Sequence, residues 1–468
     1  MAKQISQQTF DDVVRENMQE FEMDVEEAVQ DAVEQFQSQG VGLDNIVKDA
    51  SMYTGGDGEK PAVHPVVAAL ETLSQKLKES PSDGEIIQLL DAVRSECDID
   101  LARRCLAGTN NGNSVLMKAM DKYKDNSEVL KSALKCFCSL VNGQPDVLDD
   151  AGTDLLLSLL GTHNSDAGIL ELVLRAIKLT CVKHEKNRQR YVEKKLVTEL
   201  SELLSTFKKS PGVVKEVCGC FRVLTLDDDI RVPFGKSYDN AKLIVTEGNA
   251  LKTILGICED YKDNKSVLGE SFSTLASLAV RDEFCQTVME LGGLNLILKT
   301  FQQSLKDKYL TRHVLIVLKA LARNDNVKVA IVRAGGVEFV VEALIKHQAN
   351  PSIAEAACAA ITTIVLRNPH HAAKVMACGG HHHVIQAMKI HKTEPQLQKS
   401  ACMALRNLVA REREYCDQVL ALGAEELINE AISKHPICGD EAKAALRDLG
   451  CKVELKELWK GENHSIRA

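Results

Sequence analysis

The feature that most constrains the fold of this chain is a repeat of about 43 residues. Short segments with one or two glycines recur between apolar, helix-like stretches. Gly248, Gly292, Gly335, Gly379 and Gly423 mark successive copies, at intervals of 44, 43, 44 and 44 residues. Gly152 carries the same signal but lies 96 residues before Gly248, which is two repeats plus about ten residues. A regular period of this length predicts a helical solenoid, in which each repeat packs mainly on its neighbours.

Each marker is followed by an amphipathic helix of about ten residues and then by a longer, more apolar helix. The longer helices are predicted at residues 171–180, 213–224, 266–280, 309–323, 353–366, 396–410 and 441–449. Glycine at the bend allows the backbone to take a positive φ, which a side chain opposes. A degenerate copy is expected at residues 194–204, where Lys195 lies 43 residues after Gly152.

A short helix, a glycine turn and two longer helices in 42–44 residues are typical of armadillo repeats. HEAT repeats share the length but usually lack the Gly-Gly turn. Further segments are similar to the armadillo repeat-containing proteins, and among these to the sixth family. They are residues 9–17, 227–235, 331–336, 444–451 and 457–459. This resemblance implies an all-α, right-handed armadillo superhelix and a protein-binding role, with no defined biochemical activity.

The charge of the chain is concentrated at its N-terminus. Residues 1–60 hold 14 Asp and Glu against 4 Lys and Arg, whereas the remainder has 52 against 53. An acidic head repels phosphates, so nucleic acid is not expected as a partner. No apolar run approaches the length of about 18 residues that a membrane span needs. The 15 cysteines follow no disulfide framework. We expect a reduced, cytoplasmic protein with nuclear entry left open.

The acidic head, residues 1–51, is predicted to be one amphipathic helix of about 28 residues. Its apolar face is formed by Phe10, Val14, Met18, Phe21, Val25, Val29, Ala32 and Phe36. The residues from Thr9 onward resemble a capping box. A single helix cannot bury such a face alone. Three roles therefore stay open: a cap on the solenoid, an intramolecular block of its groove, or a recruiting element.

The remaining domain boundaries follow from the repeat. Residues 52–62 are glycine-rich and predict a flexible linker. Residues 63–111 predict an N-terminal helical cap or degenerate repeat. Residues 112–452 form the predicted array, with an insertion near residues 227–240. Residues 453–468 are expected to form a capping helix and tail.

The third helices offer the clearest candidate binding surface. Armadillo proteins that hold extended peptides present an Asn from each third helix, with a Trp one turn earlier. Here Asn407 alone occupies the Asn position among the repeats, and the Trp position has no Trp. The preceding position is basic in five repeats. The candidate partner-binding set is therefore Lys178, Arg222, Lys319, Arg406, Asn407 and Arg447. The two alternatives are a basic stripe for an acidic segment and ordinary solvated helix surface.

Other candidate chemistry is weaker. His370, His371, Cys378 and the histidines at 381–383 lie close in sequence. However, His381 and His383 diverge by about 200° on a helix, which argues against a zinc site. The same divergence separates Cys136 from Cys138 and Cys218 from Cys220, which favours core cysteines. The insertion is interpreted either as a structural patch or as a partner-contact loop; Asp227, Asp228 and Asp229 lack the spacing of a calcium loop.

No catalytic motif or nucleotide-binding glycine loop appears in the sequence. We expect no catalytic residues, no metal and no cofactor. The function that the sequence favours is a non-enzymatic protein–protein interaction scaffold or adaptor, with no nucleic-acid or membrane partner. The alternative is a structural subunit or chaperone-like factor within a larger complex. The sequence pattern does not determine the oligomeric state of the protein.

Overall fold

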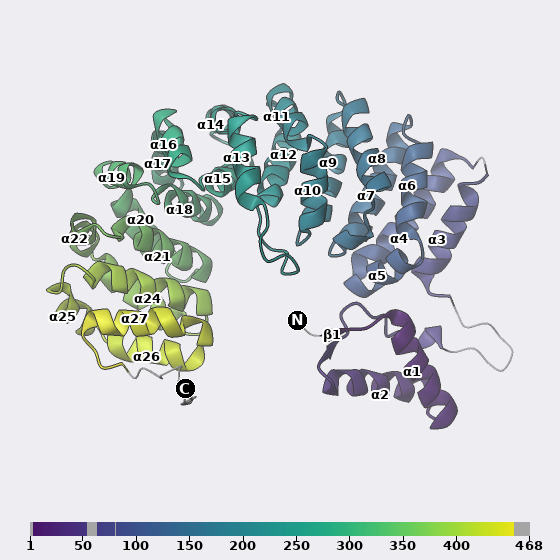
Figure 1. The fold of residues 1–468 in the computed structure, drawn as a ribbon, viewed down its shortest axis with the longest axis horizontal. Coiled ribbons are helices and arrows are strands. Elements are labelled where there is room, and N and C mark those ends of the chain that lie inside the picture. The colour runs from purple at the N-terminus through teal and green to yellow at the C-terminus, as the bar shows by residue number, and fades with distance from the viewer. Residues whose placement is uncertain (1–2, 54–62, 80, 454–468) are drawn as a thin grey trace, which may run out of the picture. The chain divides into compact units, whose positions relative to one another are not determined.

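A computed structural model describes residues 3–53, 63–79 and 81–453. The chain divides into two compact units, and the boundary in the sequence falls between Asn249 and Ala250. Both are built from helices, and the only strands among the described residues are the short pair β1, Lys3–Gln4, and β2, Val41–Gly42. The predicted all-α armadillo solenoid is confirmed (Figure 1). The predicted C-terminal helix and most of the predicted linker lie outside the described residues.

The repeats follow one pattern: a short first helix, a second helix and a longer third helix. In the first unit the first helices are α5 Leu101–Thr109, η2 Pro145–Val147, α10 Glu185–Glu193 and α13 Ser237–Thr246. The second helices are α3 Pro65–Lys76, α6 Gly112–Lys122, α8 Asp150–Thr162 and α11 Leu196–Thr206. The third helices are α4 Asp83–Ile99, α7 Ser127–Val141, α9 Ala167–Cys181 and α12 Pro211–Leu224.

The second unit continues the same order. Its first helices are α16 Asp282–Glu290, α19 Asp325–Arg333, α22 Pro369–Ala377 and α25 Tyr415–Leu420. Its second helices are α14 Ala250–Asp260, α17 Gly293–Ser304, α20 Gly336–Lys346, α23 Gly380–Ile390 and α26 Ala424–Lys434, with η3 Pro436–Cys438 after the last. Its third helices are α15 Lys265–Leu278, α18 Lys308–Leu321, α21 Pro351–Val365, α24 Pro395–Val409 and α27 Gly439–Leu449. All seven longer helices predicted from the sequence are present.

The third helices stack directly on one another within each unit, and aliphatic side chains fill the space between them. α7 packs on α4 and α9, and α9 packs on α12. In the second unit the stack runs from α15 through α18, α21 and α24 to α27. α21 shows why these helices pack closely, since its core-facing residues include Ala354, Ala357 and Ala360, each with no exposed surface. Small side chains at helical spacing let adjacent helix axes approach.

The Gly-Gly turn has a separate reason for each glycine. Gly335 has a φ of 79°, in the left-handed region that side chains disfavour. Gly336 has an ordinary φ, but a Cβ there would lie 2.6 Å from Ile331 Cγ2 and 2.9 Å from its carbonyl oxygen. The first glycine therefore turns the chain, and the second allows α19 and α20 to approach closely.

Two of the predicted turn markers were wrong. Gly152 lies in the first turn of α8, whose N-cap is Asp149, and has no positive φ. Gly248 is followed by the residue that makes the turn, Asn249, with a φ of 47°. The prediction of a degenerate turn at Lys195 is confirmed, since its φ is 64°. A non-glycine residue at such a turn leaves no glycine signal in the sequence.

The acidic head is not the single helix that its periodicity predicts. α1 spans Gln7–Glu20 and α2 spans Val25–Ser38. Between them Glu22 has a φ of 53°, and the Asp24 carboxylate accepts a hydrogen bond of 2.8 Å from the backbone N–H of Glu27. Phe21 continues the apolar spacing, yet it is 63% exposed at the turn. The head thus contains a second helix N-cap at Asp24, which the regular spacing of the apolar residues does not indicate.

The resulting helical hairpin buries its apolar face within itself. Phe10 and Phe36 have ring centroids 6.1 Å apart, and Val14 and Ala32 are fully buried beside them. The Asn17 amide crosses the hairpin and donates to the Ala28 carbonyl over 3.2 Å. β1 and β2 pair in parallel at its edge, and η1, Ala50–Met52, follows. Because the face is already covered, the hairpin has no need of the solenoid to bury it.

Candidate functional site

The six predicted partner-binding residues all lie on third helices. Lys178 and Arg222 lie on the neighbouring α9 and α12. Lys319 lies on α18, and the pair Arg406 and Asn407 on α24. Arg447 lies on α27, which packs against α24. The stacking therefore places Lys178 beside Arg222 on adjacent helices, and Arg406 and Asn407 beside Arg447. Lys319 is separated from the α24 pair by α21.

Carboxylates interrupt the basic surface in the first unit. Glu216 on α12 accepts from Lys178 Nζ over 2.5 Å and from Arg175 Nη2 over 3.0 Å. Gly219 makes this reach possible, because a Cβ there would lie 2.9 Å from the Lys178 side chain. Glu216 is buried and Lys178 is partly covered. Lys178 is thus already paired within the array, and it shares Glu216 with Arg175.

The second unit shows the same pairing. Arg406 Nε lies 3.1 Å from Asp448 Oδ2 on the next third helix, and Arg447 Nε lies 3.3 Å from Asp448 Oδ1. Asn407 donates its side-chain N–H to the Thr362 carbonyl over 3.0 Å. The one Asn at the expected ladder position therefore bonds the adjacent repeat. Lys319 is exposed, and the Arg447 side chain is 66% exposed.

The insertion between α12 and α13 is the most elaborate polar site in the first unit. We call residues 226–238 the 226–238 loop. It projects beyond the end of α12 (Figure 1) and folds back over the start of α10. Asn240 closes its base by donating from Nδ2 to the Leu224 carbonyl over 2.8 Å.

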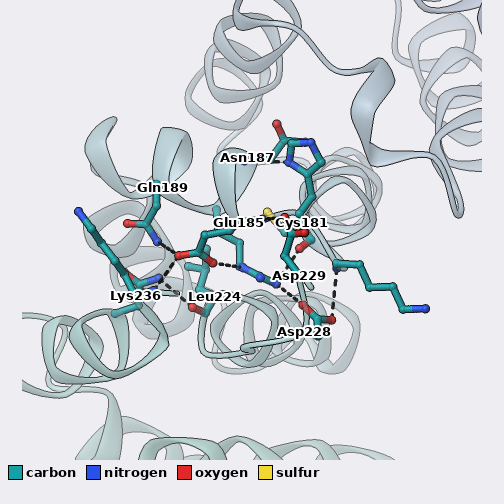
Figure 2. Close-up of polar contacts among 12 residues, drawn as sticks. Cys181, Glu185, Asn187, Gln189, Leu224, Asp228, Asp229 and Lys236 are labelled. Carbon is teal, nitrogen blue, oxygen red and sulfur yellow. Dashed lines mark hydrogen bonds and ion pairs between the residues drawn. The ribbon is translucent and has the colours of Figure 1, made fainter. Parts of the chain in front are cut away.

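Arg188 on α10 anchors the loop through contacts with Asp228. Its side chain has no exposed surface. Nη1 donates to Asp228 Oδ1 over 2.6 Å and to the Cys181 carbonyl over 3.1 Å, and Nε lies 2.8 Å from Glu185 Oε2 (Figure 2). A buried guanidinium with carboxylates on two sides is stable only while both remain in place. This arrangement fixes the position of Asp228 relative to α10.

Glu185 and Asp229 supply the next contacts. The backbone N–H of Glu185 donates to Asp229 Oδ2 over 2.9 Å, and Glu185 Oε1 accepts from the backbone N–H of Lys236 over 2.8 Å (Figure 2). These bonds tie both limbs of the loop to one turn of α10. A Cβ at Gly235 would lie 2.7 Å from Asp227 Oδ1, so a larger residue there would require the Asp227 side chain to move.

Arg231 extends the network to the preceding repeat. Its guanidinium pairs with Asp229 over 2.8 Å and with Asp146 over 2.7 Å. The hydrogen bond from Arg231 holds the pKa of Asp229 well below its usual range. Asp146 also lies 2.9 Å from His184 Nε2, while His184 Nδ1 accepts the backbone N–H of Asn187 over 3.1 Å. Three consecutive repeats are therefore linked through one loop.

The histidine-rich and cysteine-rich segments do not form a metal site in the structure. Across residues 3–53, 63–79 and 81–453, no three His, Cys, Asp or Glu side chains gather closely enough to hold a metal ion. Cys136, Cys138, Cys218 and Cys220 are buried, as the sequence predicts. Burial raises the pKa of Cys138 to about 12, so its thiol stays protonated. Within the described part of the chain, no helix is long and apolar enough to cross a membrane.

Comparison with known proteins agrees with this architecture. The chain matches the ARMC6 family model over residues 66–468 and that of the Armadillo repeat-containing protein 6 N-terminal domain over residues 2–64. It is 46% identical over 475 residues to the human Armadillo repeat-containing protein 6, covering 100% of this chain and 94% of that protein. It is 43% identical to the Drosophila melanogaster homolog, covering 98% of each.

Solved structures share the fold at low sequence identity. A crystal structure of an engineered protein aligns with a TM-score of 0.52 and 18% identity, covering 83% of this chain and 99% of that one. A chain from a structural study of the interaction between cadherin and beta-catenin aligns with a TM-score of 0.52 and 15% identity, covering 82% and 77%. These likenesses concern the fold alone. The two family matches and the full-length relatives show that the chain belongs to the armadillo repeat-containing protein 6 family.

Proposed function

We propose that this chain is a non-enzymatic scaffold or adaptor that holds a protein partner against its third helices. The side-by-side stacking of the third helices supports the proposal most directly. Stacked helices present a long surface of side chains at equivalent positions, and solenoids use such surfaces for binding. The site consists of the six third-helix residues Lys178, Arg222, Lys319, Arg406, Asn407 and Arg447.

Within this set, Lys319 and Arg447 make the largest contribution to the attraction of a partner. Both are exposed, and the Arg447 side chain is 66% exposed although it pairs with Asp448 on its own helix. Lys178 and Arg406 are paired with carboxylates on the adjacent helix and are less exposed. An acidic protein segment would gain most from the most exposed cations, which it can contact directly. Exposed charges of this kind mainly raise the association rate and select the partner.

The test is a charge reversal with a charge-matched control. The full chain carrying Lys319→Glu and Arg447→Glu is compared with the chain carrying Lys252→Glu and Lys389→Glu. The control residues are exposed lysines on the second helices α14 and α23, and the change in net charge is the same. Tagged chains are purified with their partners, which are quantified by mass spectrometry.

The third-helix variant should lose at least one direct partner by about tenfold, and the control should keep that partner. Several partners present in less than equimolar amounts would favour an adaptor. One equimolar complex that survives both pairs of substitutions would favour the alternative, a structural subunit. Equal loss in the two variants would show that net charge, rather than the third helices, determines binding.

A further inference from the structure

The 226–238 loop carries a cluster of exposed apolar side chains. Phe234 is 92% exposed, the highest value among the large hydrophobic residues that the structure describes, and Ile230 is 71% exposed. Leu226 and Tyr238 are also exposed. Four of the 14 exposed large hydrophobics in the described residues thus fall in 13 consecutive positions. Single exposed hydrophobics are common on protein surfaces, but clusters of this kind mark interaction sites.

The loop cannot collapse to bury these side chains, because the residues beside them are held in place. Asp229, before Ile230, is bonded to the backbone of Glu185, and Arg231, after it, is paired with Asp146. The backbone N–H of Val232 donates to the Asp229 carbonyl over 3.0 Å and closes a turn.

Phe234 is held in the same way from both sides. Pro233 restricts the backbone before it. The backbone N–H of Lys236, two residues later, is bonded to Glu185. An anchored loop loses little conformational freedom on binding, and such preorganisation increases affinity.

The charges around the loop argue for a protein rather than a membrane. Asp228 and Asp229 are engaged by Arg188 and Arg231. Other exposed charged residues in and beside the loop are the acidic Asp227 and Asp239 and the basic Lys183, Lys186 and Lys236. Elements that insert into anionic membranes carry a clear excess of cations. An apolar centre with a rim of both signs is the usual composition of a protein interface.

We infer that the 226–238 loop is a docking element that inserts Ile230 and Phe234 into an apolar pocket on a folded protein partner. The inference rests on the proposed protein-binding function, but it assigns binding to a surface separate from the third-helix residues. A projecting pair of apolar side chains fits a concave pocket, and buried aromatic residues contribute most to such interfaces.

Site-specific photo-cross-linking tests this assignment in the full-length chain. Phe234 is replaced by p-benzoyl-phenylalanine, and Ile437 is replaced in a second preparation as the matched control. Ile437 is 46% exposed in η3, far from the loop in sequence. The inference requires an adduct from position 234 that maps to an apolar pocket of a folded protein and is absent from position 437.

Two further measurements complete the test. With the partner identified from the adduct, Phe234→Ala and Ile230→Ser should each weaken binding by about tenfold or more, while Ile437→Ala should not. The melting temperature of these variants should stay unchanged, because the side chains are already exposed in the free chain. Phosphatidylserine–phosphatidylcholine vesicles serve as the membrane probe.

The outcomes separate this inference from the proposed function. Adducts to a second copy of this chain, equal adducts from positions 234 and 437, or vesicle binding that depends on Phe234 would each overturn it. The Lys319→Glu and Arg447→Glu variant should keep the adduct from position 234. If that variant keeps all its partners while the adduct forms, only the third-helix assignment fails.

Discussion

Arg188 Nη1 lies 2.6 Å from Asp228 Oδ1, and this contact joins a first helix to the loop that follows the third helix of the same repeat. Arg188 is fully buried, and Asp228 is partly covered. A charge in that position is tolerated only because carboxylates and a carbonyl surround it. Arg188 is therefore the buried anchor of the 226–238 loop, beside the contacts that Glu185 and Arg231 make to it.

Replacing Arg188 by Met should destabilise the surrounding repeat by about 3–5 kcal/mol, because it leaves Glu185 and Asp228 without their buried partner. Hydrogen exchange of the α10 and α12 amides measures this locally, without assuming that the whole array unfolds as one. The loop amide of Lys236 should lose protection most. Arg15→Met is the control, since Arg15 pairs with Asp12 at the surface, and it should change stability by less than about 0.5 kcal/mol. Similar effects from both substitutions would contradict the anchoring role.

Acid should weaken the same region through His184. Burial, assisted by the charge of Arg231, lowers the pKa of His184 below its usual 6.5, although Asp146 opposes the shift. The unfolded chain therefore binds the proton more readily than the folded one. The contribution to stability is complete above about pH 6.5 and is lost as the pH falls through the folded-state pKa.

The geometry gives the reason, since a proton on His184 Nδ1 would remove its bond to the backbone N–H of Asn187. The melting temperature should fall between pH 7.5 and 5.5. His184→Asn keeps an oxygen acceptor at this N-cap and has no titrating ring, so its melting temperature should fall less over that range. Burial also lowers the pKa of His64 and His371, so a residual slope is expected. Identical slopes in the two proteins would show that His184 is not involved.

A glycine in a turn between first and second helices and a glycine inside a helix should respond in opposite ways to replacement by alanine. Gly335→Ala should destabilise by about 1–2 kcal/mol, because its φ of 79° is strained for any side chain and the nearest atom to a new Cβ is 4.0 Å away. Gly256→Ala should stabilise by about 0.5–1 kcal/mol, because Gly256 lies in the helix α14 with open space around it.

Lys195→Gly should relieve strain at the equivalent turn, where φ is 64°, and stabilise by about 0.5 kcal/mol after the entropic penalty of glycine. Urea unfolding of the three variants measures whether each substitution raises or lowers the free energy of unfolding. Destabilisation by Lys195→Gly would mean that the lysine side chain has a packing role at that turn.

The sequence was sufficient to predict the solenoid, because its turns depend on local backbone chemistry. Glycines at 292, 335, 379 and 423 have positive φ, and their spacing could be read directly. Turns at Asn111, Lys195 and Asn249 have the same geometry without glycine, so the period was lost in the first half of the chain. A turn of this kind can be predicted from the local sequence only where glycine occupies the position with positive φ.

The hairpin in the acidic head and the anchored loop depend on contacts that spacing does not encode. The apolar period continues through Phe21, although Asp24 starts a second helix. Arg188 occurs in a polar stretch typical of exposed helix, and its burial depends on Asp228, 40 residues later. The repeat was sufficient to assign the cations to third helices, and their part in binding stays a prediction. Their pairing with Glu216 and Asp448 requires the stacking of neighbouring helices, which only the structure supplies.

The most direct test of the account is quantitative recovery of partners with the full chain, the Lys319→Glu and Arg447→Glu variant and the Lys252→Glu and Lys389→Glu control. We predict that at least one direct partner falls by about tenfold in the third-helix variant alone. Recovery of the same partners at the same level from all three chains would contradict binding through the third helices.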